Sequence, residues 1–172
     1  TVFASIISRY QDPDGDLGIS DEGWEIAAKF LGNAHNIADG EDAVGSVING
    51  TYPMDEHWAS GVLTEQKDRD YKFQIMTPDI GEPYVVESLA ISAGTKKYDT
   101  CVAFLNWLGS SDVQLDWSNN YGTIPCQKEA LTQVSDDIKE LMETLKPQDL
   151  DWSFIAENVD AWVEKAELEY VQ

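Results

Sequence analysis

The sequence predicts an α/β fold in which helices outnumber strands. Most of its segments repeat apolar residues at the three- and four-residue spacing of an amphipathic helix. Only two segments are typical of strands: residues 70–76 alternate apolar and polar side chains, and residues 85–91 form an almost continuous apolar run. A proline- and glycine-rich segment lies between them. We therefore expect a helix-rich domain with a small mixed sheet.

Three helices are predicted before the first strand. Residues 2–10 place apolar side chains at helical spacing, and an acidic turn then ends this helix. Ser20 is the expected N-cap of a second helix, because its hydroxyl can accept a hydrogen bond from a free backbone N–H group. Gly32-Asn33 is the expected end of that helix. A third, weaker helix is expected over residues 39–48.

The C-terminal half is also mainly helical. Residues 101–108 are expected to form a buried helix that Gly109 ends. Ser111 is expected to cap a shorter helix over residues 112–119. The remaining helices are expected over residues 128–134, 136–145 and 152–170, with a break at Pro147.

Composition and charge limit the classes of function. The 172 residues are 42% hydrophobic and include six tryptophans, which favours a folded domain. Thirty-two acidic residues against 11 basic ones give a formal net charge of −21. This charge excludes nucleic acid as a partner, because binding phosphates needs clustered lysine and arginine. It either attracts a cationic ligand at long range or simply keeps the surface soluble.

Residues 78–125 contain the most informative order of motifs. A Pro-x-x-Gly crossing leads into an apolar strand, a lysine-containing turn, a helix and a returning segment. The motifs after the crossing are Glu87-Ser88-Leu89-Ala90-Ile91, Gly94-Thr95-Lys96 and Tyr121-Gly122-Thr123-Ile124-Pro125. This order resembles the two-lobed, class II solute-binding proteins of ABC importers, including the branches that take polyamines and ferric iron or thiamine. The alternative is a naturally small α/β domain that shares the pattern.

The resemblance implies the C-terminal part of a two-lobed, periplasmic-binding-protein-like fold. It implies that residues 1–77 are a lobe-two segment, residues 78–125 the hinge crossing with a lobe-one strand and helix, and residues 126–172 the C-terminal helices. It also implies a protein without catalysis or cofactor that captures a small solute and presents it to an ABC permease. The expected location is extracytoplasmic, with a lipid anchor in the intact protein. A C-terminal portion alone is expected to bind the solute weakly or not at all, and self-association is a further expectation.

Glu87 is the first candidate ligand-binding residue. A carboxylate within an apolar strand is costly to bury without a partner. It is therefore expected either to reach solvent at a cleft and hold a cation, or to form a structural ion pair at the strand edge. In the resembling polyamine branch, an acidic residue at this position binds a ligand ammonium. That branch has an aromatic residue where Val85 stands here, and Tyr84 is expected to compensate.

Trp58 and Thr1 complete the predicted ligand site. Trp58 lies roughly where the resembling family places a cleft aromatic, whose face can hold a cation. The alternative for Trp58 is a place in the core. Thr1 matches a hydroxyl that the family places at a helix N-terminus, where free N–H groups attract an anionic ligand group. Its alternative is a frayed chain end. The four residues together predict a site for a small, cationic organic solute such as a polyamine or a thiamine-like ligand.

The acidic segment that runs from Asp12 to Glu22 gives a second functional hypothesis. Leu17 stands where a calcium loop needs glycine, and Gly23 stands where it needs the bidentate glutamate. The segment is therefore either an acidic turn with Asx-type hydrogen bonds or the centre of a stand-alone acidic interaction or calcium-binding module. The weak calcium candidates are Asp12, Asp14, Asp16 and Ser20.

The remaining reactive residues carry weaker predictions. Cys101 and Cys126 fit neither a zinc motif nor a redox pair, and they are expected to be either a disulfide or two buried thiols. His35 and His57 share no motif. The sequence has none of the common hydrolase, nucleotide-binding or zinc-protease motifs, so it predicts no enzyme. It also lacks the tandem tyrosine pair of the iron branch, which disfavours ferric iron.

Overall fold

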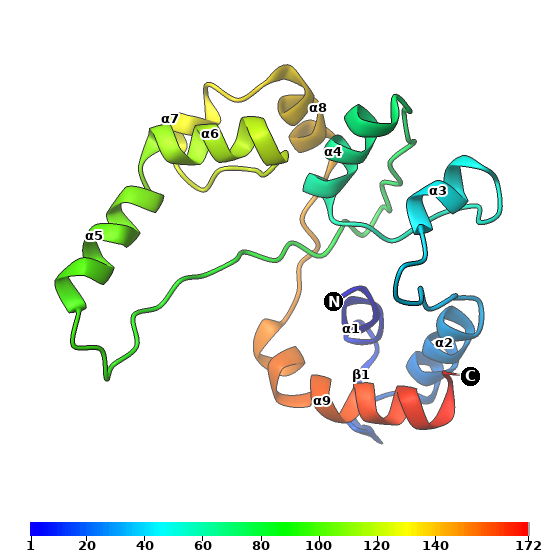
Figure 1. The fold of residues 1–172 in the computed structure, drawn as a ribbon. Helices are drawn as coiled ribbons and strands as arrows, with labels where there is room; N and C mark the ends of the chain where they lie inside the picture. Colours follow the sequence, from blue (N-terminus) through cyan, green and yellow to red (C-terminus); the bar gives the residue numbers. More distant parts are fainter. Residues whose placement is uncertain (172) are drawn as a thin grey trace. The chain divides into compact units, whose positions relative to one another are not determined.

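The computed structural model describes residues 1–171, in which nine helices and one strand are formed (Figure 1). None of the described helices is long and apolar enough to cross a membrane. The elements are α1 (Val2–Ile7), β1 (Gln11–Asp16), α2 (Asp21–Gly32), α3 (Ala43–Ile48), α4 (Ala59–Arg69), α5 (Tyr98–Leu108), α6 (Ser111–Tyr121), α7 (Lys128–Leu131), α8 (Asp136–Thr144) and α9 (Trp152–Glu169).

The chain divides into two compact units. The first unit contains Thr1–Glu41, Ile80–Tyr84 and the segment from Pro147 onward, and the second contains Asp42–Asp79 and Val85–Lys146. The division expected from the resemblance, into residues 1–77, 78–125 and 126–172, stays a prediction.

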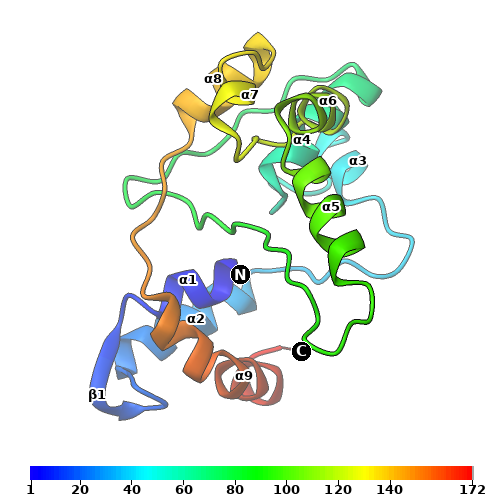
Figure 2. The ribbon, with the colours of Figure 1, turned by 90° about the vertical axis from the view of Figure 1, so that its left-hand side faces the viewer.

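The core of the first unit is formed by α1, α2 and α9, which lie side by side (Figure 2). Trp162 is its largest fully buried side chain. The indole Nε1 of Trp162 donates a hydrogen bond to the Leu17 carbonyl at 3.0 Å, and the Phe154 ring lies 5.3 Å from the Trp162 ring. The buried members of this core are Ala4, Ile7, Ile19, Trp24, Ala27, Ile155 and Trp162.

Lys165 joins α9 to the end of β1. Its Nζ lies 3.2 Å from Asp16 Oδ2 and 2.8 Å from Glu169 Oε2. The same ammonium group lies over the Trp24 ring, 5.1 Å from the ring centroid. The hydrogen bond to Glu169, followed by that to Asp16, raises the pKa of Lys165, although burial opposes the shift. The charge of this partly buried side chain is therefore neutralised by two carboxylates and stabilised by an aromatic face.

The second unit has a much smaller core. Its buried side chains come mainly from α7, α8 and the turn between them, whereas α3, α4 and α5 bury no residue completely. The end of α6 is fixed by Ser118, whose buried hydroxyl donates to the Thr123 carbonyl at 2.7 Å. Gln114 Nε2 donates to the Leu108 carbonyl at 2.9 Å and so holds α6 to the end of α5.

The helix-rich character of the predicted fold is confirmed, and several helix ends agree closely. Ser20 caps α2, because its hydroxyl accepts a hydrogen bond from the Gly23 N–H at 3.3 Å. Asn33 ends α2 and Gly109 ends α5, as expected. The third helix begins later than predicted, because the Asp42 carboxylate caps it at Gly45.

The two predicted strands and the mixed sheet are wrong. Residues 70–76 and 85–91 are irregular, and the one described strand, β1, forms bridges only with Ile19. A strand needs a hydrogen-bonding partner, and in residues 1–171 neither segment has one. The helix expected to be buried over residues 101–108 is also exposed: Phe104 and Trp107 of α5 keep 51% and 55% of their surface accessible.

The protein consequently exposes a large area. Its accessible surface is 12176 Å² for a mass of 19.2 kDa. Two separate compact domains of half this mass would together expose about 10,000 Å². The difference is consistent with the many apolar side chains of the second unit that remain in water.

Replacing Trp162 by alanine is expected to lower the free energy of unfolding by about 3–5 kcal/mol, because the substitution empties a fully buried site. Trp152→Ala is the matched control, since Trp152 lies on the same helix but is 47% exposed. Its expected effect is about 0.5 kcal/mol or less. Urea unfolding followed by far-UV circular dichroism measures both changes. Equal losses in the two variants would contradict the place of Trp162 in the core.

Candidate functional site

The four predicted ligand residues are divided between the two units. Thr1 and Tyr84 belong to the first unit, and Trp58 and Glu87 belong to the second. Thr1 is exposed at the start of α1 and makes no side-chain cap hydrogen bond. Tyr84 is half-buried, and burial, followed by the nearby Glu82 carboxylate, raises the pKa of its hydroxyl group.

Glu87 is exposed on an irregular segment, and no strand surrounds it. Its neighbours Val86 and Leu89 are 68% and 60% exposed. The expected cost of burying its carboxylate therefore does not arise, because the group is in water. Within residues 1–171, Glu87 forms no ion pair with a lysine or an arginine. The predicted structural ion pair is therefore not formed within the described residues, and the role of Glu87 in holding a cation stays a prediction.

Trp58 is the N-cap residue of α4, and its side chain is 63% exposed. Its carbonyl accepts a hydrogen bond from the Val62 N–H at 3.1 Å, so its backbone is part of the first helical turn. The alternative of a core tryptophan is therefore wrong. An exposed indole on an ordered backbone is available to stack on a ligand.

The segment that enters α4 packs closely against it. The imidazole of His57 lies against Gly61, where a Cβ atom would come within 2.5 Å of His57 Nε2. Asp55 Oδ2 lies 3.5 Å from His57 Nδ1. Because Gly61 has no side chain, the His57 ring packs directly against the first turn of the helix.

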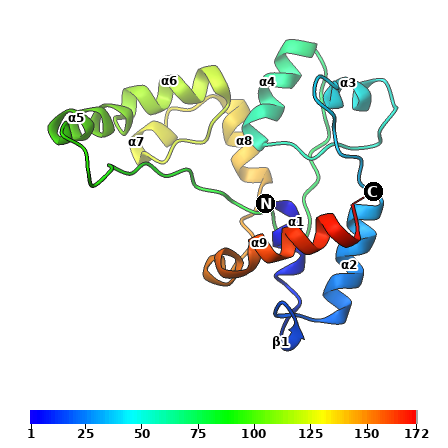
Figure 3. The ribbon, with the colours of Figure 1, turned by 60° about the horizontal axis from the view of Figure 1, so that its bottom comes forward.

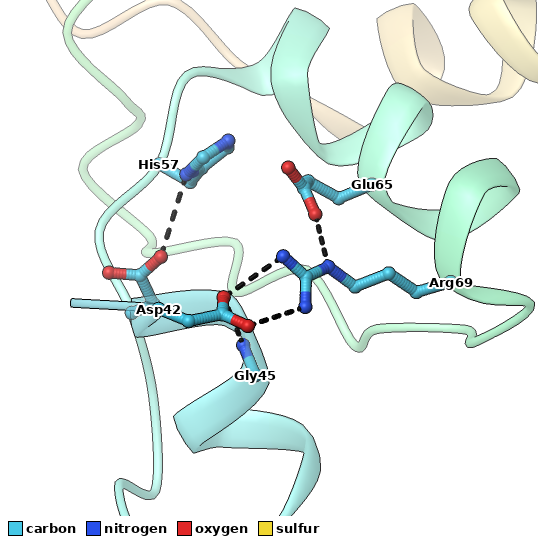
Figure 4. A network of polar contacts seen from close by, with 6 residues as sticks. Asp42, Gly45, His57, Glu65 and Arg69 are labelled. Atoms are coloured by element: carbon cyan, nitrogen blue, oxygen red, sulfur yellow. Dashed lines mark hydrogen bonds and ion pairs between the residues drawn. The ribbon is translucent and has the colours of Figure 1, made fainter. Parts of the chain in front are cut away.

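Arg69 holds the other end of α4. Its guanidinium donates to both carboxylate oxygens of Asp42, at 2.8 and 2.9 Å, and also to Glu65 (Figure 4). Asp42 in turn accepts a hydrogen bond from the Gly45 N–H at 2.9 Å and so caps α3. The hydrogen bond from Arg69, followed by that from Gly45, lowers the pKa of Asp42. Asp42 and, secondarily, Glu65 raise the pKa of Arg69.

Sequence reasoning missed an aromatic pair on α6. Trp117 and Tyr121 are 46% and 61% exposed, and their ring centroids are 5.8 Å apart. Gly122 ends α6 with a left-handed φ of +68°, and a Cβ atom there would lie 2.6 Å from the Ser60 carbonyl oxygen. The signal was present as two aromatic residues four positions apart, followed by glycine.

The acidic loop does not gather its side chains around one point. Asp12 accepts a hydrogen bond from the Asp14 N–H at 3.0 Å, Asp16 pairs with Lys165, and Ser20 caps α2. Within residues 1–171, no three His, Cys, Asp or Glu side chains are arranged to hold a metal ion. These contacts agree with the acidic turn.

Neither the two cysteines nor the cavity of the first unit involves the predicted ligand residues. Cys101 is a half-buried free thiol and Cys126 is an exposed one, so the two form no disulfide. The alternative prediction of two buried thiols is wrong for Cys126. A cavity of about 320 Å³ lies in the first unit, lined by Ser8, Arg9, Gln11, Asp149, Leu150 and Asp151. None of the four predicted ligand residues lines it.

Comparison with known proteins gives two matches. A sequence model of the bacterial extracellular solute-binding proteins matches residues 3–147. A probable ABC transporter periplasmic-binding protein of Sinorhizobium fredii is 33% identical over 170 residues, which are 99% of this chain and 47% of that protein. The chain thus spans about half the length of this curated relative. No solved structure matches the chain.

Replacing Asp42 by asparagine is expected to change the acid stability of the second unit. The pKa of Asp42 is lower in the folded state, so its stabilising effect is present above about pH 4 and is lost as the pH falls through the lowered pKa. Asp42→Asn should therefore be less stable than the natural chain at pH 7 and should lose less stability on acidification. Urea midpoints at pH 7 and at about pH 3 measure this.

Asp68→Asn is the matched control for the charge change, because Asp68 is an exposed residue of α4. It should keep the pH dependence of the natural chain. If Asp42→Asn also kept it, the ion pair with Arg69 would not contribute to stability.

Proposed function

Because this chain belongs to the bacterial extracellular solute-binding proteins, we propose that it captures a small organic cation for an ABC importer. The match over residues 3–147 supports the transport role. The observation that carries the ligand class is the exposed carboxylate of Glu87, which has no basic partner in the described chain. Lys72 and Lys96 bracket a stretch with no lysine or arginine, so no positive charge near it in sequence competes for this carboxylate.

The charge of the chain supports a cationic solute. A net charge of −21 raises the local concentration of cations and speeds their association at low salt. The same charge disfavours anionic solutes. Salt should therefore weaken the encounter, because charges more than about 10 Å apart are largely screened at 0.1 M salt.

Glu87, Tyr84 and Trp58 would each make a different contact with the solute. The Glu87 carboxylate would meet the ammonium group, and the exposed indole of Trp58 would take an alkyl chain or a ring on its face. The Tyr84 hydroxyl would donate a hydrogen bond, and the raised pKa keeps it protonated at neutral pH. Thr1 would contribute only where the solute carries an anionic group. A polyamine and a thiamine-like ligand both fit these groups.

The chain crosses between its two units four times, and the intact protein is proposed to be a hinged binding protein. The chain passes between the units at residues 41–42, 79–80, 84–85 and 146–147. Within the first unit, the crossing at Ile80–Tyr84 pairs with the later one, because the Gln148 N–H donates to the Glu82 carbonyl at 2.8 Å. Closure of two lobes around a solute by changes at a few hinge residues is a common mechanism of ligand capture.

The intact protein would act outside the cytoplasm, attached to the membrane by a lipid, and would present its closed form to an ABC permease. No catalytic step is proposed. The exposed apolar side chains of residues 85–89 support self-association of the chain at high concentration.

Replacing Glu87 by glutamine is expected to weaken the binding of spermidine, putrescine or thiamine by about tenfold or more, because the amide oxygen still accepts a hydrogen bond but the negative charge is lost. Isothermal titration calorimetry at low salt measures the affinities. Glu140→Gln is the matched control, since it removes the same charge from an exposed position on α8. Equal affinities in both variants would refute Glu87 as the ligand carboxylate.

A further inference from the structure

We propose that Trp117 and Tyr121 of α6, together with Trp58 of α4, form an aromatic surface that binds the alkylammonium group of an organic cation. The inference rests on the proposed function, because the surface shares Trp58 with the proposed ligand site. It differs from that site in one respect: all three side chains belong to the second unit.

The junction of α4 and α6 brings the three aromatic residues onto neighbouring turns. Gly122 at the end of α6 lies against the Ser60 carbonyl in the first turn of α4, and Trp58 is the cap of that same turn. Figures 1 and 3 both show the end of α6 beside the start of α4. Tyr121 directly precedes Gly122, and Trp117 lies one helical turn earlier on the same face.

The backbone under these rings is fixed. The left-handed φ of Gly122 and its close approach to Ser60 exclude any larger residue at this position. Ser118, between the two aromatic residues, is fully buried and bonded to the Thr123 carbonyl. The backbone that carries the rings is therefore fixed, while 46% to 63% of each side chain stays in water. Large exposed aromatic residues on a rigid support are typical of a binding surface.

The charges around the junction select a cation as the occupant. Helix α6 contains Asp112 and Asp116 and no lysine or arginine. The segment of residues 51–61 contains Asp55 and Glu56 and also no lysine or arginine. An anion or an acidic segment would be repelled here, whereas an alkylammonium group is attracted both by the carboxylates and by the negative faces of the rings.

A second aromatic pair provides an internal contrast. Phe104 and Trp107 on α5 have ring centroids 5.6 Å apart and exposures of 51% and 55%, which match those of Trp117 and Tyr121. Within the described residues, however, the extensive packing of α4 is against α6 and not against α5. If exposure of an aromatic pair were sufficient, the pairs on α5 and α6 would bind the cation equally well. If the junction with α4 is required, only the pair on α6 binds it.

The test follows the six tryptophan indole N–H signals by ¹H–¹⁵N NMR while choline is added at millimolar concentrations. Single Trp→Phe variants assign the signals. We expect saturable shifts of the Trp117 and Trp58 signals and none of the Trp107 signal. The neutral isostere 3,3-dimethylbutan-1-ol should produce much smaller shifts. Equal shifts with the isostere, or equal shifts at Trp107, would overturn the proposal.

Variants separate this surface from the Glu87 site. Tyr121→Leu should weaken choline binding about two- to fivefold, and the matched change Phe104→Leu should leave it unchanged. Gly122→Ala should abolish the joint response of Trp58 and Trp117, whereas Gly94→Ala, where a Cβ atom meets nothing within 4 Å, should preserve it.

The outcomes distinguish the two proposals. If Tyr121→Leu weakens choline binding while Glu87→Gln leaves spermidine binding unchanged, the aromatic surface is supported and the Glu87 site is refuted. If Glu87→Gln weakens spermidine binding while Tyr121→Leu changes the affinity for neither choline nor spermidine, the Glu87 site is supported and the aromatic surface is refuted. Failure of the natural chain to shift any indole signal with choline also overturns the aromatic surface.

Discussion

Helix α4 is anchored at both ends, and the candidate site of the second unit depends on this constraint. At its C-terminal end, Arg69 binds the carboxylate that caps α3. At its N-terminal end, the turn capped by Trp58 meets the end of α6 through Gly122. The helix buries no residue completely, so these polar and backbone contacts, more than a hydrophobic core, set its position. An exposed tryptophan on an unanchored helix would lose more conformational freedom on binding and would bind less tightly.

The two units are stabilised by different kinds of contact. The first unit surrounds Trp162 and Trp24 with apolar side chains and adds the paired charge of Lys165. The second unit uses local hydrogen bonds between consecutive elements and leaves much of its apolar surface in water. Local opening is therefore expected to need less free energy in the second unit. Binding surfaces are commonly drawn from such less stable regions, and the proposed contact residues Trp58 and Glu87 lie in this unit.

Local signals in the sequence predicted local structure well. Ser20, Asn33 and Gly109 mark helix ends because capping depends on residues within one turn. Residues 85–91 show the limit of this reasoning: their composition suits a strand, but a strand also requires a partner far away in sequence. The same reasoning selected Glu87 for a burial that does not occur, although its freedom from a basic partner keeps the ligand hypothesis open to test. Trp117 and Tyr121 were missed because their meeting with α4 depends on the backbone of Gly122.

The hydrogen bond between Trp162 and Leu17 determines when the first unit can fold during synthesis. These residues are 145 positions apart, and the rest of the first unit lies between and beyond them in three separate stretches. The core around α1 and α2 cannot close until α9 has left the ribosome. The whole second unit is synthesised between α2 and α9, so the apolar faces of α1 and α2 stay exposed until α9 is complete.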